Sequence, residues 1–528
     1  MAIQLRTFPF VLIAVIISAA VLLPMATRHL VYIQNDALAP FWLIDQAYHG
    51  ETLVADRQQW LLPLLIGVGL KAFGVADSYS ALMHVSTACT AIFLSLTAIP
   101  MYSLALRFGG ERAALVAVAL LLTNAQFGIS GLYLNPTVPF TFLVTTFFAV
   151  LVWMPEIPRA RGLFVLAVIA GLSVFVRHEG LIIIALLVLI VCWHVLFRRL
   201  DYRLATGAIA IAAAFCLANY AIRLLWVNDA VGFLRNTGTT NAFFSLPKLG
   251  LRDALRYVMA VFNYKSEVLI TFAVSLTVPL LLLVPFGAAV SLPQKKNAGF
   301  LLLYIVLYEA VVVAYLLILP VTSYFLQNFT VSHQVIALQS VIRYYQVFTP
   351  ILLLFATLGG QEVFSLFQAT LPLQARKPAC IGLLSLLALF CVHQQILLMN
   401  TYPALFTDAE PHAAEAVETA DWFRNRKIRN AQIAMFAPSL HPVHFSILSG
   451  NDVNCWGGQS NPNWNCEHAR GATTEQILSG GVPFFSYILI ERDVDMRIDK
   501  EKYVPVFATS RGRYQILQNV KAAVSAPR

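Results

Sequence analysis

The stretch FPFVLIAVIISAAVLLPMA, residues 8–26, decides the class of fold. It carries no charged residue, and its length matches the roughly 20 apolar residues that a helix needs to cross a bilayer. Similar runs recur along the 528-residue chain, which is 59% hydrophobic and 12% charged, with a mean hydropathy of +0.71. Backbone polar groups inside a bilayer must be satisfied within the segment. The sequence therefore predicts an all-α polytopic membrane protein.

This first run and its successors define the predicted spans. Arg6 before the run and the small Ala26 at its end also fit a signal peptide, but the run is long for one, so we interpret it as a retained anchor. Segment 60–73 is apolar but short, which predicts an interfacial or re-entrant helix. The further spans bring the total to about eleven: 79–106, 113–123, 138–154, 162–176, 181–197, 204–227, 268–292, 298–321, 347–367 and 379–399.

The charged residues predict the orientation of these spans. The short connectors are all basic: 107–112, 159–161, 198–203, 295–296 and 376–377. Three longer connectors, 28–59, 228–267 and 322–346, mix both signs. The positive-inside rule then places the N-terminus in the cytoplasm, and an odd number of spans places the tail outside. These connectors and anionic lipid account for the net charge of +9, and no nucleic-acid motif is present.

The tail, residues 401–528, differs in character from residues 1–400. It is polar, and its segment PHAAEAVETADWFRNRK, residues 411–427, has the pattern of an amphipathic helix. Short runs typical of β-strands follow at 431–436, 484–490 and 513–518. We therefore expect a small α/β domain outside the membrane after the membrane domain.

Two cysteines in this tail provide a second indication of the side of the membrane on which it lies. Cys455 and Cys466 lie in CWGGQSNPNWNC, which we interpret as a loop rich in Gly, Asn and Pro. A disulfide between them requires an oxidising compartment, in agreement with the outward orientation. A metal site with nearby histidines and a pair of free thiols are the alternatives, although the spacing does not fit a zinc knuckle.

Polar side chains gather at the predicted outer ends of the spans. Ionisable groups beside the apolar zone are costly and point to function. Acids and cations at one face predict acid–base chemistry beside an anion, and a polyprenyl phosphate at the membrane surface fits. Helix capping, snorkelling to headgroups and an aromatic belt are the structural alternatives. The residues are Asp36, Asp45, His49, Asp56, Arg57, Tyr133, Asn135, Arg177, His178, Glu179, Lys265, Glu267, Arg343, Tyr344 and Tyr345.

Several motifs resemble one known family. An acid opens the first outer loop after a membrane anchor, and DRQQWLLP follows at residues 56–63. Together with GLSVFVRHEGL and RYYQVFTPILLLFATLGG, this order resembles the GT-C glycosyltransferases. The subgroup is the one related to protein O-mannosyltransferases, aminoarabinose transferases of lipid A and Rgt-type galacturonosyltransferases. The resemblance covers about 400 residues, mostly as pattern, and the tail has no part in it.

The resemblance implies transfer of a sugar, with inversion, from a polyprenyl-phosphate donor to a glycolipid, glycan or protein acceptor outside the membrane. Asp36 takes the position of the family's general base. The residues Phe41, Trp42, Ile44 and Tyr48 that follow it are expected to hold an amphipathic helix in the membrane interface. Many relatives have two adjacent acids at the position of the base, whereas this chain has Asn35 before Asp36, so Asp56 remains a second candidate. A phosphate leaving group needs positive charge rather than a proton, and the expected cations are Arg343, Arg177 and Lys265.

The remaining predictions concern partners and competing functions. We expect no cofactor. No carboxylate cluster demands a metal, and a divalent metal requirement stays open. The lipid bilayer is a partner, and the resemblance points to the bacterial inner membrane, with a periplasmic C-terminal domain and a role in the cell envelope or lipopolysaccharide. An O-antigen-type ligase or polymerase, and a lipid transporter or flippase, are the alternatives. Transporters usually place charges near the midplane and have repeated halves, which this sequence lacks.

Overall fold

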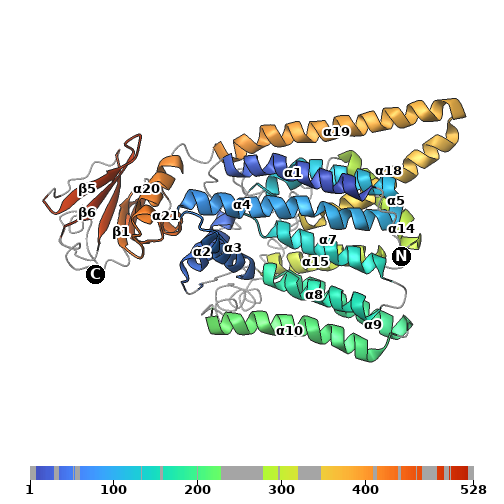
Figure 1. The fold of residues 1–528 in the computed structure, drawn as a ribbon, viewed down its shortest axis with the longest axis horizontal. Coiled ribbons are helices and arrows are strands. Elements are labelled where there is room, and N and C mark those ends of the chain that lie inside the picture. The colour runs from blue at the N-terminus through green and yellow to red at the C-terminus, as the bar shows by residue number, and fades with distance from the viewer. Residues whose placement is uncertain are drawn as a thin grey trace, which may run out of the picture.

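The computed structural model describes most of the chain in separate ranges. These are residues 7–28, 35–51, 53, 60–132, 134–154, 159–198, 200–226, 278–294, 298–318, 346–407, 413–437, 440, 442–458, 461–465, 485–492, 499 and 501–520. Figure 1 shows an elongated molecule in which a bundle of roughly aligned helices carries a small sheet domain at one end. The N-terminal end of the chain lies at the opposite end of the bundle.

The helices of the bundle cover the described parts of the predicted spans, although the predicted span 79–106 is divided between helices 79–96 and 98–123, and helix 125–130 lies outside the predicted spans. Each expected apolar run has a helix over its described part, as long apolar segments in a bilayer require. Among the described residues, six helical stretches are long and apolar enough to cross a membrane, and the total of about eleven stays a prediction. The bundle helices are α1 (Phe8–Arg28), α4 (Tyr79–Leu96), α5 (Ala98–Thr123), α6 (Ala125–Ser130), α7 (Thr137–Trp153), α8 (Ala160–Val176), α9 (Gly180–Arg198), α10 (Tyr202–Trp226), α14 (Val278–Gln294), α15 (Ala298–Ile318), α18 (Thr349–Thr370, after the 3-10 turn Gln346–Phe348) and α19 (Leu373–Thr407).

A glycine separates two of the predicted spans inside α5. Gly110 has φ 78° and ψ −173°, a backbone conformation that is open essentially to glycine alone. The helix is therefore kinked between the predicted spans 79–106 and 113–123. The basic connector 107–112 surrounds the kink, as the sequence predicted.

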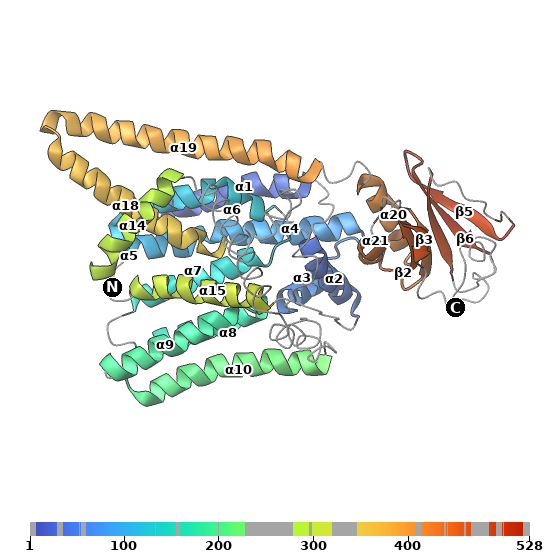
Figure 2. The same ribbon diagram turned by 180° about the vertical axis from the view of Figure 1, so that it is seen from behind.

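Two glycines allow α14 and α18 to pack at very short range, side by side (Figure 2). A Cβ on Gly287 would collide with the backbone of Phe355, and one on Gly359 would collide with the backbone of Leu283. Such approach of small residues is a common way for membrane helices to associate, because burial from water is no driving force there.

Substitution of Gly359 by valine is expected to destabilise the bundle. Because the added methyl groups would meet backbone rather than a movable side chain, the two helices must separate, at a cost of about 3 kcal/mol. The thermal unfolding midpoint of the detergent-solubilised protein measures this. Gly382→Val in α19 is the control, since a Cβ there meets nothing within 4 Å. Equal destabilisation by both variants would contradict the packing argument.

The C-terminal part is a mixed sheet with two helices, as predicted. Helix α20 (Ala413–Asn425) precedes β1 (Gln432–Phe436), and α21 (Pro442–Ser449) connects β1 to β2 (Asp452–Gly458). The other strands are β3 (Asn461–Asn465), β4 (Tyr487–Glu491), β5 (Tyr503–Ala508) and β6 (Tyr514–Asn519). The sheet order is β3-β2-β1-β4-β6-β5, with β1 parallel to β2 and β4, and the remaining pairs antiparallel.

One local prediction in this domain is wrong. The Gly- and Asn-rich segment that we interpreted as a loop supplies β2 and β3 (Figure 2). Cys455 pairs with Ala434 of β1, and Trp456 pairs with Asn465 of β3. Pairing with β1 therefore overrides weak strand propensity. Strand β3 lies at the edge of the sheet, where Pro462 is tolerated.

The sheet domain and the bundle share one hydrophobic core. Phe41 and Ile44 of α2 (Asn35–His49) are fully buried in the same cluster as Phe423 of α20 and Ile433 of β1. The Phe41 ring contacts the Tyr79 ring edge-on, with 4.8 Å between the ring centres. The sequence predicts that Phe41, Trp42, Ile44 and Tyr48 hold this helix in the membrane interface. For Phe41 and Ile44 this is wrong, because they pack against protein.

Short helix α3 (Leu61–Ala72) lies beside α2 at this junction (Figure 1). It occupies the segment 60–73 for which a short interfacial or re-entrant helix was predicted. Trp60, just before α3, donates from Nε1 to Asn219 Oδ1 of α10 at 2.9 Å.

The division between residues 400 and 401 that we predicted from composition falls inside α19.

Candidate functional site

The predicted site residues divide into two groups by what the structure describes. Asp36 lies in the first turn of α2, and Cys455 lies in β2. Asn135, Arg177, His178 and Glu179 are described with their side chains. The predictions for Asp56, Arg57, Tyr133, Lys265, Glu267, Arg343, Tyr344, Tyr345 and Cys466 concern residues outside the described ranges.

The turn between α8 and α9 holds an ion pair at the end of the bundle nearest the sheet domain (Figure 1). Arg177 donates to both carboxylate oxygens of Glu179, from Nη2 at 2.5 Å and from Nε at 3.0 Å. Both side chains are largely buried, with 11% and 19% of their areas exposed. The turn is tight, because a Cβ on Gly180 would collide with the backbone of Ser173 and Val174.

This ion pair is joined to two other segments. Arg177 Nη1 donates to Thr137 Oγ1 at the start of α7. Asn135 Oδ1 accepts from the Thr137 backbone N–H at 2.9 Å, and Asn135 Nδ2 donates to Gln346 Oε1 at 3.5 Å. Both amide side chains are 2% exposed. We call Asn135, Thr137, Arg177, Glu179 and Gln346 the Arg177 cluster.

The Arg177 cluster brings together residues that were predicted separately. Burial raises the pKa of Glu179, but the guanidinium of Arg177 outweighs burial and holds that pKa below its ordinary value of 4.5. Glu179 is therefore ionised at neutral pH and compensates the charge of Arg177. In this arrangement the cluster fixes the ends of α7, α8 and α18 relative to one another, and it places a guanidinium beside them.

An apolar crevice adjoins the Arg177 cluster. The residues that line it include Ile44 of α2, Ile66 of α3, Phe93 of α4, Asn135 and Val176. The free volume is about 20 Å³, which is room for about one water molecule. The crevice is therefore almost closed in this arrangement of the helices.

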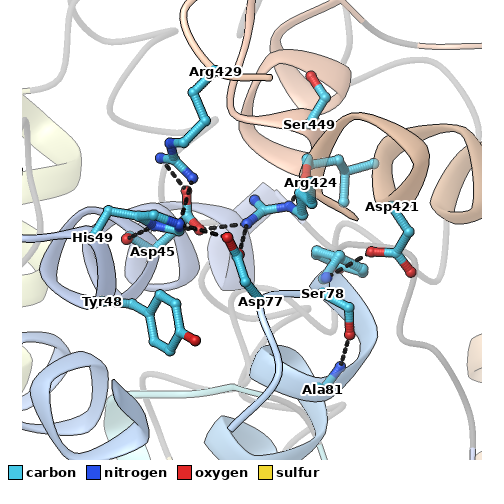
Figure 3. A network of polar contacts seen from close by, with 12 residues as sticks. Asp45, Tyr48, His49, Asp77, Ser78, Ala81, Asp421, Arg424, Arg429 and Ser449 are labelled. Carbon is cyan, nitrogen blue, oxygen red and sulfur yellow. Dashed lines mark hydrogen bonds and ion pairs between the residues drawn. The ribbon is translucent and has the colours of Figure 1, made fainter. Parts of the chain in front are cut away.

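A second polar network joins α2 to the sheet domain (Figure 3). Asp45 Oδ1 accepts from Arg424 Nη1 at 2.5 Å, and Asp45 Oδ2 accepts from Arg429 Nη2 at 3.0 Å. Asp77, between α3 and α4, lies 2.8 Å from His49 Nε2 and 3.4 Å from Arg424. We call Asp45, His49, Asp77, Arg424 and Arg429 the Asp45 network.

The central ion pair of the Asp45 network, between Asp45 and Arg424, is buried. The Arg424 side chain is 0% exposed and that of Asp45 is 2% exposed. Arg424 Nε also donates to the carbonyl of Leu448 at 2.5 Å, and its guanidinium lies 5.8 Å from the centre of the Phe41 ring. Removal of one partner of such a pair leaves an uncompensated buried charge. The sheet domain is therefore anchored through charge to the helix that carries Asp36.

The same contacts shift the pKa values of three side chains in the network. Burial raises the pKa of Asp45, but Arg424 and Arg429 outweigh it and hold that pKa below 3.8. Burial likewise raises the pKa of Asp77, and His49 and Arg424 bring it below 3.8. Burial lowers the pKa of His49, but its bonds to the Asp77 carboxylate and the Asp45 carbonyl raise it above 6.5 despite the nearby Arg429.

The stability of this junction is expected to depend on pH in two directions. The carboxylates stabilise the folded state above pH 3.8, and this is lost as the pH falls through their lowered pKa values. His49 stabilises fully below pH 6.5, and its contribution is lost as the pH rises through its raised pKa. We expect a lower unfolding midpoint at pH 9 than at pH 6, and a smaller difference in His49→Gln. An unchanged difference in the variant would contradict the assignment to His49.

Asp45, His49 and Asp77 could also be considered as metal ligands, because one ligand atom from each lies within 4.8 Å of the others. The donor set does not fit a cation in this arrangement. Both oxygens of Asp45 accept from guanidinium groups, and Arg424 also contacts Asp77. A divalent ion would have to displace two arginines from the same carboxylate.

Asp45 and His49 were among the polar residues expected at the outer face, but the other three members of the Asp45 network were not predicted. Arg424 falls within the segment that was predicted as an amphipathic helix and Arg429 follows it, while Asp77 lies in a short connector that drew no attention. Asp45 and Arg424 are separated by 379 positions, so no local pattern links them. The local signals were Asp45, an acid inside the largely apolar stretch FWLIDQAY of α2, and His49 one turn later.

Comparison with known proteins identifies the fold. The apo structure of ArnT from Cupriavidus metallidurans matches with a TM-score of 0.56 and 14% identity, over 98% of this chain and 99% of that chain. The structure of the same protein bound to undecaprenyl phosphate matches with a TM-score of 0.54 and 14% identity, over 100% of both chains. The apo structure of the oligosaccharyltransferase of Archaeoglobus fulgidus matches with a TM-score of 0.51 and 13% identity, over 91% of this chain and 69% of that chain.

No protein-family model matches the sequence, and no curated protein is significantly similar to it. At these identities the solved structures show the fold alone. The predicted architecture, a GT-C-like bundle with a small C-terminal α/β domain, is thereby confirmed. The helices also confirm a multi-pass membrane protein.

Proposed function

We propose that this chain, which has the fold of the GT-C glycosyltransferases, is an inverting glycosyltransferase. It moves a sugar from a polyprenyl-phosphate donor to a glycolipid, glycan or protein acceptor at the end of the bundle that carries the sheet domain. In this proposal that end faces the periplasm, and the N-terminus lies in the cytoplasm. The enzyme would act in the bacterial inner membrane.

One observation carries the proposal. The chain matches, over its whole length, a protein whose structure was solved with undecaprenyl phosphate bound. The match includes the sheet domain as well as the bundle. The Arg177 cluster, at the end of the bundle beside that domain, supplies an arginine that fits a role near a lipid phosphate.

The proposed chemistry divides between an acid and several cations. The carboxylate of Asp36 accepts the proton of the acceptor hydroxyl as its oxygen attacks the anomeric carbon. The bond from that carbon to the phosphate oxygen breaks, and the polyprenyl phosphate leaves with the electron pair. Arg343, Arg177 and Lys265 would stabilise the charge on this phosphate, and Asp56 is the alternative base.

A reconstituted assay tests the proposal. The full chain in lipid nanodiscs would receive radiolabelled sugar on undecaprenyl phosphate, together with envelope glycolipid extracted from the host. Labelled glycolipid and released undecaprenyl phosphate are expected in equal amounts. Movement of the intact donor between leaflets of proteoliposomes, without release of the sugar, would overturn the proposal in favour of a flippase.

Arg343→Ala is expected to impair use of the donor more than use of the acceptor. If Arg343 contacts the donor phosphate, its loss raises KM for the donor about tenfold or more, as for a hydrogen bond to a charged group. Initial rates at varied donor and varied acceptor concentrations separate the two. Equal changes of both KM values would contradict a phosphate role for Arg343.

A further inference from the structure

An open groove of about 690 Å³ lies on the bundle near the end opposite the sheet domain. Its walls are apolar and come from the junction of α4 and α5, from α7, and from the start of α8. Leu96, Ile99, Phe142 and Val150 are among the lining residues. The volume is within the range of small-molecule sites. Because its walls are membrane helices, the groove is open to lipid chains.

Arginines converge at one end of this groove. Arg159 and Arg161, beside the N-terminus of α8, belong to its lining and are exposed. Arg107 of α5 comes from a different basic connector. Its Nε donates to the carbonyl of Val152 at 3.4 Å, and its guanidinium lies 5.3 Å from the centre of the Trp153 ring.

Trp153 lines the groove, and a hydrogen bond holds its ring in place. Trp153 Nε1 donates to the carbonyl of Ser103 at 2.8 Å, which fixes the ring between α5 and α7. Within the described ranges, neither Arg159 nor Arg161 forms an ion pair with a carboxylate. The groove therefore combines an apolar channel with positive charge at one end.

We propose that this groove binds an acidic phospholipid of the surrounding membrane. An acyl chain would lie along the apolar wall, and the phosphodiester would contact Arg159 and Arg161, with Arg107 close by. Arginine favours phosphate oxygens, and basic pockets between membrane helices select anionic headgroups. The site is independent of the proposed sugar transfer and lies near the other end of the bundle.

Native mass spectrometry of the full chain in mild detergent tests this site, with phosphatidylglycerol and phosphatidylcholine of identical acyl chains as probes. We expect phosphatidylglycerol to bind more tightly. The double variant Arg159→Gln, Arg161→Gln is expected to weaken its binding about thirtyfold, from the usual effect of two basic residues near a membrane surface. Binding of phosphatidylcholine is expected to change little.

Two further variants separate a groove from general surface charge. Thr146→Trp fills the groove without changing its arginines, and it is expected to weaken binding of both lipids. Arg203→Gln removes an exposed arginine of α10, outside the groove lining, and is expected to have no effect. The proposal is overturned if Arg203→Gln causes the same loss as the double variant, or if Thr146→Trp leaves phosphatidylglycerol binding intact.

Competition identifies the source of the phosphate. Inorganic phosphate has the headgroup charge but no chain, and it is expected not to displace phosphatidylglycerol at equal concentration. Undecaprenyl phosphate has the charge and a much longer chain than this short groove accommodates. Displacement by either compound at or below the concentration of the bound phospholipid would show that the assignment to phospholipid is wrong.

Discussion

Asp36→Asn is expected to lower the rate of sugar transfer at least about a hundredfold, the smallest usual contribution of a general base. Asparagine has nearly the shape of aspartate but does not accept a proton. Asp36 lies in the first turn of α2, where a side chain of the same size is expected to leave the helix intact. The measurement is single-turnover transfer with labelled donor in nanodiscs.

The controls for this experiment separate chemistry from folding and from the second acid. The unfolding midpoint and the affinity for undecaprenyl phosphate are expected to be unchanged in Asp36→Asn. Asp56→Asn is the matched variant, because it makes the same change at the other candidate. Undiminished transfer in Asp36→Asn, with a large loss in Asp56→Asn, would assign the base to Asp56.

The helices could be predicted well because each rests on local information. A run of about twenty apolar residues has few options in a bilayer. The same holds for the kink at Gly110, which lies between two predicted spans inside a short basic connector. The helix 413–425 and strands β1, β4 and β6 were visible for a similar reason, since their periodicity is local.

What could not be predicted depends on contacts between distant segments. Strands β2 and β3 form because β1 and β2 pair in parallel, not because their residues favour strands. Phe41 and Ile44 looked like residues for a membrane surface because they are apolar, yet the sheet domain covers them. Hydrophobicity does not distinguish lipid from protein as the neighbour of a side chain.

The candidate site was predicted in part for the same reason. Polar residues at span ends share a face once the topology is known, and the structure does join Asn135 to Arg177 through Thr137. The Asp45 network, by contrast, needed the docking of the sheet domain. It gives this domain a physical connection to α2, and hence to Asp36, that the sequence did not indicate.

Asp45→Ala is expected to destabilise the protein by about 3–5 kcal/mol, the usual cost of breaking a buried ion pair by removing one partner. Arg424 is 0% exposed and would lose its 2.5 Å contact to Asp45, while the longer 3.4 Å contact to Asp77 and the bond to the Leu448 carbonyl would remain. Because α2 also carries Asp36, transfer is expected to fall with the loss of docking. Chemical unfolding and limited proteolysis between α19 and α20 measure these effects.

Glu51→Ala is the matched control for this variant. Glu51 also pairs with the sheet domain, through Arg429 at 3.0 Å, but its side chain is 36% exposed, so its loss should cost less than about 1 kcal/mol. The double variant Asp45→Leu, Arg424→Met tests the cause, since an apolar pair of similar volume often replaces a buried ion pair without loss of stability. If the double variant is no more stable than Asp45→Ala, the unpaired charge is not the reason for the loss. If Asp45→Ala unfolds like Glu51→Ala, the buried ion pair does not anchor the sheet domain to α2.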